Sequence, residues 1–110
     1  IIYIIFTIGF FSIISTQTQA QCQDVIPCTH DFEDFVISGS CDQACNCTYT
    51  LLDFTASNPG VVRARPYKNG VLQLGPTIDL ESGDELCFLI GYTNGSCEEC
   101  CFEEEDWCDF

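Results

Sequence analysis

Basic residues are almost absent from this chain. Its 110 residues include three lysines and arginines against 17 aspartates and glutamates, which gives a formal net charge of -14. A nucleic-acid-binding protein needs a basic face for the phosphate backbone, so the composition excludes that class. An acidic disordered tail is excluded too, because such tails are poor in aromatic residues, whereas this chain is 13% aromatic and contains ten cysteines.

Catalytic signatures are missing as well. The sequence has one histidine, His30, and it contains no G-x-S-x-G motif, no H-E-x-x-H motif and no glycine-rich phosphate loop. A lone histidine without a nucleophile is usually a surface residue, and we expect His30 to lie at the surface. The chain is therefore predicted not to be an enzyme and to use no cofactor.

The N-terminal segment has neither charge nor methionine. Residues 1–14 form an almost unbroken apolar run, a polar stretch follows as far as Ala20, and the first charged residue is Asp24. This pattern is typical of a secretory signal peptide. We expect residues 1–20 to be a signal peptide whose beginning lies upstream of residue 1, and residues 21–110 to be a single acidic, secreted domain. A membrane anchor is the alternative, but a spanning helix needs about 20 apolar residues, and the apolar run here covers only residues 1–14.

Cysteine is the residue present in excess. The ten cysteines are Cys22, Cys28, Cys41, Cys45, Cys47, Cys87, Cys97, Cys100, Cys101 and Cys108. Such a density in a short secreted chain indicates a disulfide scaffold, in which each bridge contributes about 2–4 kcal/mol. The bridges would hold together a domain that its own negative charge drives apart.

The pairing of the cysteines stays open, because many combinations are allowed. Adjacent Cys100 and Cys101 are expected to bond to different partners. The dense groups at 41–47 and 97–108 lie on either side of a long cysteine-free stretch, and we expect them to be brought together in space. Zinc coordination by thiolates is the alternative, but histidine is scarce and an oxidising compartment favours disulfides, so no metal site is predicted.

Short apolar, β-branched or aromatic segments alternate with glycine, proline and asparagine turns. They are residues 32–38, 47–55, 61–67, 71–74, 77–80 and 85–93. These patterns are typical of strands, and no helical pattern of useful length is present. The predicted fold class is small, disulfide-rich and all-β. We expect a compact antiparallel sandwich or barrel of about five to six short strands, followed by a cysteine-rich C-terminal segment.

Two of these segments carry more specific signals. Asn69-Gly70 follows residues 61–67 and predicts a tight hairpin, because a type I′ turn needs positive φ at both positions. Pro66 limits the preceding strand to an edge position or ends its pairing. Residues 85–93 are apolar on both faces, which makes them the best candidate for a central strand.

Carboxylates are concentrated near the C-terminus, with seven in residues 97–110. The candidate partner-binding residues there are Glu103, Glu104, Glu105, Asp106 and Trp107. Clustered negative charge attracts basic partners or divalent cations, although the spaced ligands of a high-affinity calcium loop are absent. A solvated acidic segment without a partner is the alternative, and Trp107 could equally pack against the disulfides.

The basic residues form one group, and Arg63, Arg65 and Lys68 all lie on the predicted hairpin. We expect them to pair with acidic side chains of the same chain, with contact to a receptor as an alternative. A further interpretation makes the hairpin the reactive loop of an inhibitor of trypsin-like proteases, with Arg63-Ala64 as the exposed peptide bond.

Two sequences match the acceptor pattern for N-linked glycosylation, Asn46-Cys47-Thr48 and Asn94-Gly95-Ser96. We expect both asparagines to lie at the surface, with Asn94 in a turn.

Together these features predict a small secreted cysteine-rich protein that acts by surface recognition of an extracellular partner, as defence or venom proteins do. One alternative is an acidic matrix or mineral-associated protein that binds divalent cations, and another is the protease inhibitor. Neither nucleic acid nor membrane is expected as a partner after signal cleavage. The target and the oligomeric state stay open.

Overall fold

The computed structural model describes residues 22–108, so the predicted signal peptide lies outside the described residues. Within this range the strands are β1 (Asp24–Ile26), β2 (Val36–Cys41), β3 (Cys47–Leu51), β4 (Val61–Lys68), β5 (Val71–Leu72), β6 (Thr77–Leu80), β7 (Leu86–Tyr92) and β8 (Ser96–Phe102). The helices are the short 3-10 helix η1 (Phe32–Phe35), α2 (Phe54–Ser57) and α3 (Glu104–Trp107). No helix in the described range is long and apolar enough to cross a membrane.

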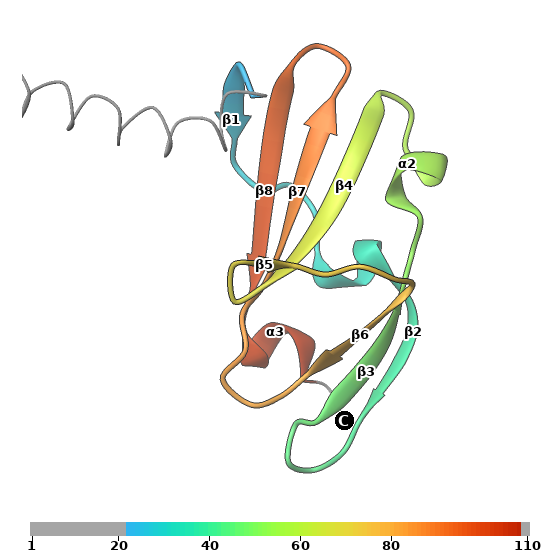
Figure 1. Cartoon of the computed structure of the whole chain (residues 1–110), viewed down its shortest axis with the longest axis vertical. Coiled ribbons are helices and arrows are strands. Elements are labelled where there is room, and N and C mark those ends of the chain that lie inside the picture. The colour runs from blue at the N-terminus through green and yellow to red at the C-terminus, as the bar shows by residue number, and fades with distance from the viewer. Residues whose placement is uncertain (1–21, 109–110) are drawn as a thin grey trace, which may run out of the picture.

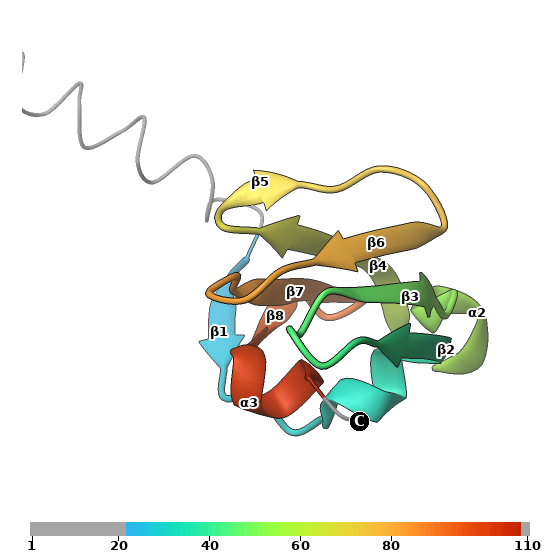
Figure 2. The same cartoon turned by 90° about the horizontal axis from the view of Figure 1, so that it is seen from below.

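The strands form two sheets, which lie one above the other in Figure 1. The larger sheet has five strands in the order β1-β8-β7-β4-β5, and the smaller has three in the order β2-β3-β6. β1 runs parallel to β8, whereas the other neighbouring strands are antiparallel. Buried side chains from both sheets form one core. Figure 2 shows α3 and η1 at the same edge of this arrangement.

The predicted fold class is confirmed, and each of the expected segments contains a strand. The sequence pattern does not predict β1 or β8. β8 consists of Ser-Cys-Glu-Glu-Cys-Cys-Phe, and acidic residues are depleted in strands. It is nevertheless an inner strand of the larger sheet, with Glu98, Cys100 and Phe102 on its buried face.

Two predicted strands are partly wrong. The segment 32–38 opens with η1, because Phe32 and Phe35 are three residues apart and a 3-10 turn places both toward the core. In the segment 47–55, strand β3 ends early and α2 follows, with the Asp53 side chain capping its first turn.

The predicted hairpin and the central position of β7 are confirmed. Asn69 and Gly70 have φ values of 51° and 83°, as a type I′ turn requires. Pro66 pairs with Phe88 of β7, and its carbonyl accepts a hydrogen bond from the Gln73 N–H on the other side of β4 (2.8 Å). The nitrogen of Pro66 faces that same side, so the ladder between β4 and β7 loses no hydrogen bond.

Aromatic rings fill the core. Phe35 stacks on Phe88 with ring centroids 4.1 Å apart, and it also packs against Phe54 at 4.8 Å. Trp107 of α3 has an exposed fraction of zero, and its Nε1 donates to the Asp84 carbonyl oxygen (3.3 Å). Trp107 therefore packs in the interior, which was the alternative to its prediction as a partner-binding residue. It does not form part of a partner-binding surface.

The disulfide scaffold is confirmed, and all ten cysteines are paired. The bonds are Cys22–Cys97, Cys28–Cys100, Cys41–Cys47, Cys45–Cys108 and Cys87–Cys101. As expected, the adjacent Cys100 and Cys101 reach different partners. They can do so because neighbouring residues of a strand point to opposite faces of the sheet.

The expected junction of the two dense cysteine groups is formed by one bond only, Cys45–Cys108. Residues 97–101 are linked to the N-terminal segment and to β7, not to residues 41–47. One bond, Cys45–Cys108, connects the middle group to a late cysteine, and it holds the end of α3 against the turn after β2.

Gly39 of β2 gives a first prediction, because a Cβ built on it would lie 2.1 Å from Cδ1 of the Tyr49 ring. Tyr49 is held in place, since it is buried and its hydroxyl donates to the Trp107 carbonyl. We expect Gly39→Ala to lower the free energy of unfolding by about 1–3 kcal/mol. The neighbouring substitution Ser40→Ala, at an exposed position of the same strand, should change it by less than about 0.5 kcal/mol. Urea unfolding of both variants measures this, and equal stabilities would contradict the packing described.

A second prediction compares two disulfides that span very different lengths of chain. Cys45–Cys108 has a sequence separation of 63 and Cys41–Cys47 a separation of 6. If loop closure in the unfolded chain dominates, replacing both cysteines by alanine should cost about 4 kcal/mol for the long loop and about 2 kcal/mol for the short one. Denaturant unfolding of the two double variants checks the order. A larger loss for Cys41–Cys47 would show that local geometry, rather than loop length, decides.

Candidate functional site

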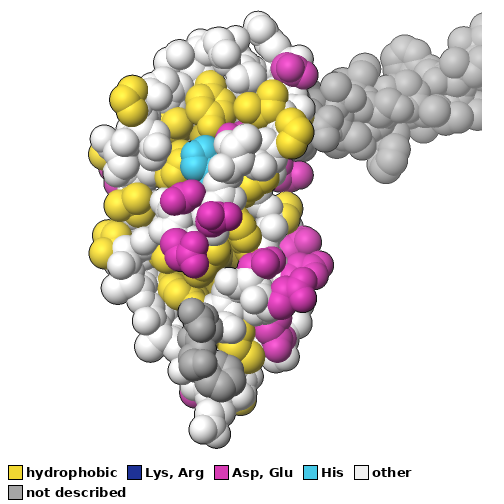
Figure 3. Space-filling model, turned by 180° about the vertical axis from the view of Figure 1, so that it is seen from behind, with side chains coloured by type: hydrophobic (Ala, Val, Ile, Leu, Met, Phe, Trp, Pro, Cys, Tyr) yellow, Lys and Arg dark blue, Asp and Glu magenta, His cyan; other side chains and the backbone are white. Residues whose placement is uncertain are grey.

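An acidic groove of about 510 Å³ lies between α3 and the turn that joins β6 to β7. Its lining residues are Cys45, Gly83, Asp84, Glu85, Glu103, Glu104, Glu105 and Cys108. Among these described residues there is no lysine, arginine or histidine. Figure 3 shows acidic side chains gathered along one flank of the molecule, with no Lys or Arg visible on that face.

The two walls of the acidic groove are joined by hydrogen bonds. The Glu104 carboxylate accepts from the Ser82 hydroxyl (2.6 Å) and from the Gly83 N–H (2.9 Å). The Asp84 carboxylate accepts from the Asn69 side chain (2.8 Å) and from the Glu81 N–H (2.8 Å). These hydrogen bonds lower the pKa of the Asp84 carboxyl, and the bond from Asn69 has the largest effect. The groove therefore carries its negative charge on a fixed framework.

Only some of the carboxylates that were predicted to bind a partner line this groove. Glu103, Glu104 and Glu105 line it, whereas Asp106 does not and instead accepts a hydrogen bond from the Glu103 N–H at the start of α3 (2.9 Å). Asp84 and Glu85 were not among the predicted site residues. They come from a turn about twenty residues earlier, and only the fold brings them beside α3.

The basic residues lie on β4, outside the groove lining. The Lys68 ammonium donates to the Asp79 backbone carbonyl (3.1 Å), and Arg65 is exposed. Neither of these two residues forms an ion pair with a carboxylate in the described part of the chain, although the positive charge of Lys68 contributes to lowering the pKa of Asp84. The Arg63-Ala64 bond lies within the stretch of β4 that pairs with β7, which differs from the exposed loop that a protease inhibitor presents.

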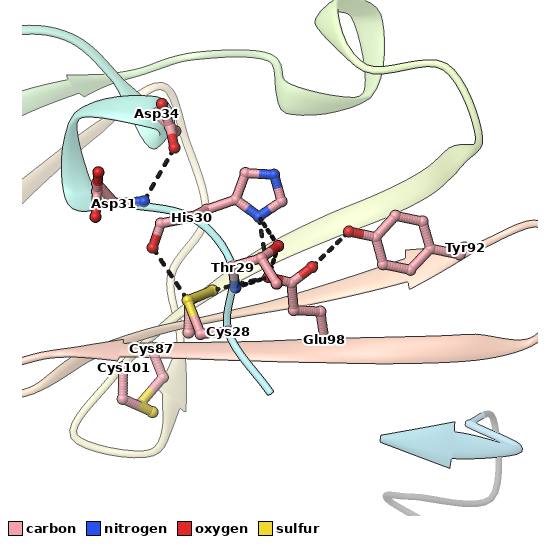
Figure 4. Close-up of a disulfide and its surroundings, with 10 residues drawn as sticks. Cys28, Thr29, His30, Asp31, Asp34, Cys87, Tyr92, Glu98 and Cys101 are labelled. Atoms are coloured by element: carbon pink, nitrogen blue, oxygen red, sulfur yellow. Dashed lines mark hydrogen bonds and ion pairs between the residues drawn. A yellow bond between two sulfur atoms is a disulfide. The ribbon is translucent and has the colours of Figure 1, made fainter. Parts of the chain in front are cut away.

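A second cluster surrounds Glu98, whose exposed fraction is zero (Figure 4). Its Oε2 accepts from the Thr29 N–H (2.5 Å), the Thr29 hydroxyl (2.9 Å) and His30 Nδ1 (3.0 Å). Its Oε1 accepts from the Tyr92 hydroxyl (2.6 Å). The carboxylate therefore ties the N-terminal segment, β7 and β8 together.

These contacts set the ionisation of the cluster. Burial alone would raise the pKa of Glu98, but the hydrogen bonds from Tyr92, Thr29 and His30 outweigh it and lower the pKa to about 2. Burial, followed by the bond to the Glu98 carboxylate, raises the pKa of Tyr92 to about 12. A charged buried carboxylate is stable here because each of its oxygens has a donor.

The expected surface position of His30 is confirmed only in part, because its side chain is partly exposed but also contacts buried groups. Its side chain is 23% exposed, donates a hydrogen bond from Nδ1 to the Glu98 carboxylate, and packs edge-on against the rings of Phe35 and Phe54. No sequence pattern predicts the contact between His30 and Glu98, because Glu98 stands among acidic residues and is 68 positions away. Both hydrogen bonds of the His30 ring use Nδ1, one of them to the neighbouring Thr29 hydroxyl. The cluster joins chain segments, and we assign it a structural role.

The thiolates that the zinc alternative requires are not available in the described residues. Three groups of side chains have metal-ligand spacing, but each of them includes two cysteines that are bonded to one another. A disulfide sulfur offers no thiolate to a metal ion.

The two glycosylation candidates are both exposed, as expected. The Asn46 amide nitrogen donates to the Asp42 carboxylate (3.1 Å). Asn94 lies in the turn between β7 and β8, and its amide oxygen accepts from the N–H and the hydroxyl of Ser96 (3.0 and 2.6 Å).

Comparisons of this chain with protein families, with curated proteins and with solved structures find no match. The acidic groove and the Glu98 cluster are therefore interpreted from their own chemistry.

A third prediction concerns the pH dependence of stability. The pKa of Glu98 falls from 4.5 to about 2 on folding. The contribution of its charged carboxylate to the free energy of unfolding is therefore fully present above about pH 5 and is lost as the pH falls toward 2. This amounts to about 3 kcal/mol. We expect Glu98→Gln to be destabilised near neutral pH and to approach the stability of the wild type in acid. Its neighbour Glu99 is exposed, so Glu99→Gln should follow the wild-type curve. Denaturant unfolding between about pH 7 and pH 2 tests this, and parallel curves for Glu98→Gln and wild type would contradict it.

Proposed function

We propose that this protein is a small secreted recognition protein that binds a basic extracellular partner through the acidic groove. The observation that carries the proposal is the convergence of five carboxylates from two chain segments, Asp84, Glu85, Glu103, Glu104 and Glu105, around one groove. Glu103, Glu105 and Glu85 are exposed and therefore accessible to a partner. The negative electrostatic potential of these carboxylates speeds the approach of a cationic partner and disfavours the binding of an anionic one.

Secretion is the second part of the proposal. Five disulfides in a domain of this size persist in an oxidising compartment and are rare in the cytosol. The apolar segment of residues 1–14 supports the same interpretation. Exposed Asn94 and Asn46 would then be accessible for glycosylation.

Binding of divalent cations is the alternative use of the same carboxylates. Calcium prefers several oxygen ligands at about 2.3–2.6 Å, but the hydrogen bonds of Glu104 and Asp84 already direct their oxygens toward the protein. We therefore favour a basic macromolecule, which can be attracted by the summed charge without such close coordination.

A fourth prediction tests the groove with a hexalysine peptide as the probe. We expect isothermal titration at about 20 mM salt to show saturable binding that weakens strongly at about 300 mM, because exposed charges are then screened. The double variant Glu103→Gln/Glu105→Gln should bind about five- to tenfold more weakly, since it removes two exposed charge contacts.

The matched control is Asp24→Asn/Glu33→Gln, which removes the same charge at exposed positions of β1 and η1. It should retain most of the affinity. An equal loss in both double variants would mean that the peptide senses only net charge, and the groove proposal would then be wrong. Saturable heat with calcium at submillimolar concentration would favour the cation alternative.

A further inference from the structure

A second groove lies on the face of the larger sheet that points away from the core, and its volume is about 390 Å³. We call it the outer-face groove, and its lining residues are Tyr67, Gly70, Glu85, Cys87, Leu89, Glu99 and Cys101. Strand register explains its composition. Tyr67 of β4 pairs with Cys87 of β7, which pairs with Cys101 of β8, so the three side chains form one row across the sheet. Leu89 and Glu99 form part of the next row.

The floor of the outer-face groove is apolar and partly aromatic. It is formed by the Cys87–Cys101 disulfide, the half-buried Leu89 and the half-buried ring of Tyr67. Figure 4 shows this disulfide on the side of the strands opposite Glu98. A sheet face that carries hydrocarbon, sulfur and an aromatic ring in one hollow offers contact area to an apolar stem.

The charged groups of this groove are both negative. Glu85 and Glu99 are exposed, and neither carboxylate accepts a hydrogen bond or forms an ion pair within the described residues. A carboxylate oxygen of Glu85 lies within 4.8 Å of both disulfide sulfurs, so the charge reaches the edge of the apolar floor. Arg65 lies on the same face in the row of Leu89 but does not line the groove.

Glu85 also lines the acidic groove, so the two hollows share this residue. A basic partner that occupies the acidic groove would therefore meet the outer-face groove next to it. The second hollow differs from the first in having an apolar floor and an aromatic ring.

We propose that the outer-face groove binds an arginine side chain of the basic partner, an inference that rests on the proposed function. The methylene stem would lie on Leu89 and the disulfide, and the guanidinium would stack on Tyr67 while facing Glu99. Arginine fits better than lysine, because its planar guanidinium is weakly hydrated, stacks on aromatic rings and pairs with a carboxylate through two parallel hydrogen bonds.

A fifth prediction follows, measured by titration with hexaarginine and hexalysine peptides of equal charge. The wild type should bind hexaarginine about fivefold more tightly. Glu99→Gln and Tyr67→Leu should each bring this ratio close to one. Asp24→Asn, which removes the same charge as Glu99→Gln at an exposed position elsewhere, should leave the ratio unchanged. Because Tyr67 is half-buried, the unfolding curve of its variant is measured in parallel.

The outcomes separate this inference from the proposed function. If both peptides bind equally to the wild type and Glu103→Gln/Glu105→Gln weakens both, the acidic groove stands and the arginine site is wrong. If neither peptide binds, the proposed function is wrong, and nuclear magnetic resonance with N-acetyl-arginine amide then decides on the groove itself. Shifts of the Tyr67 and Leu89 signals that N-acetyl-lysine amide does not produce would support the site, and their absence would overturn it.

Discussion

The covalent attachment of β8 is the constraint on which the rest of the structure depends. Three of the five disulfides end on this strand, and they link it to Cys22, Cys28 and Cys87. A strand of mostly acidic and cysteine residues has little preference for a sheet, and a net charge of -14 opposes compaction. Cross-links shrink the unfolded ensemble and so allow this strand to lie inside the sheet. The Glu98 carboxylate is part of the same junction, because the segment that donates to it is held by Cys28–Cys100.

The parts of the fold that sequence patterns predict are those in which the local signal and the tertiary role agree. The Asn69-Gly70 turn is an example, since its positive φ values are a property of the turn residues themselves. The central strand β7 is another, because it lies between β8 and β4 and buries the apolar side chains of its core face, as its pattern predicts. η1 and α2 are too short for periodicity to distinguish them from strands, and their positions follow from the need to turn Phe35 and Phe54 into the core.

The site was less predictable because its residues are brought together by long-range contacts. The acidic segment 103–105 could be recognised from composition, but Asp84 and Glu85 look like an ordinary turn. Glu98 and Glu99 are chemically identical neighbours in sequence, yet one is fully buried and the other exposed, since a strand presents alternate residues to opposite faces. Without the strand assignment of β8, no pattern in the sequence separates the structural carboxylate from the surface one. Trp107 shows the converse, because an aromatic residue among acids suggests a binding anchor, whereas the helical turn of α3 directs it into the core.

The same charge connects stability with the proposed recognition. Carboxylates gathered around one groove repel one another, and this repulsion lowers the stability of the folded state relative to an expanded chain. The disulfides offset that cost, since Cys45–Cys108 itself lines the acidic groove and fixes α3 beside it. A cationic partner relieves the repulsion only in the folded protein, where the carboxylates are close together. Partner binding must therefore stabilise the fold by mass action. The carboxylates of the groove therefore repel one another in the folded protein, and a bound cation would reduce this repulsion. The disulfides allow the fold to tolerate the repulsion when no cation is bound.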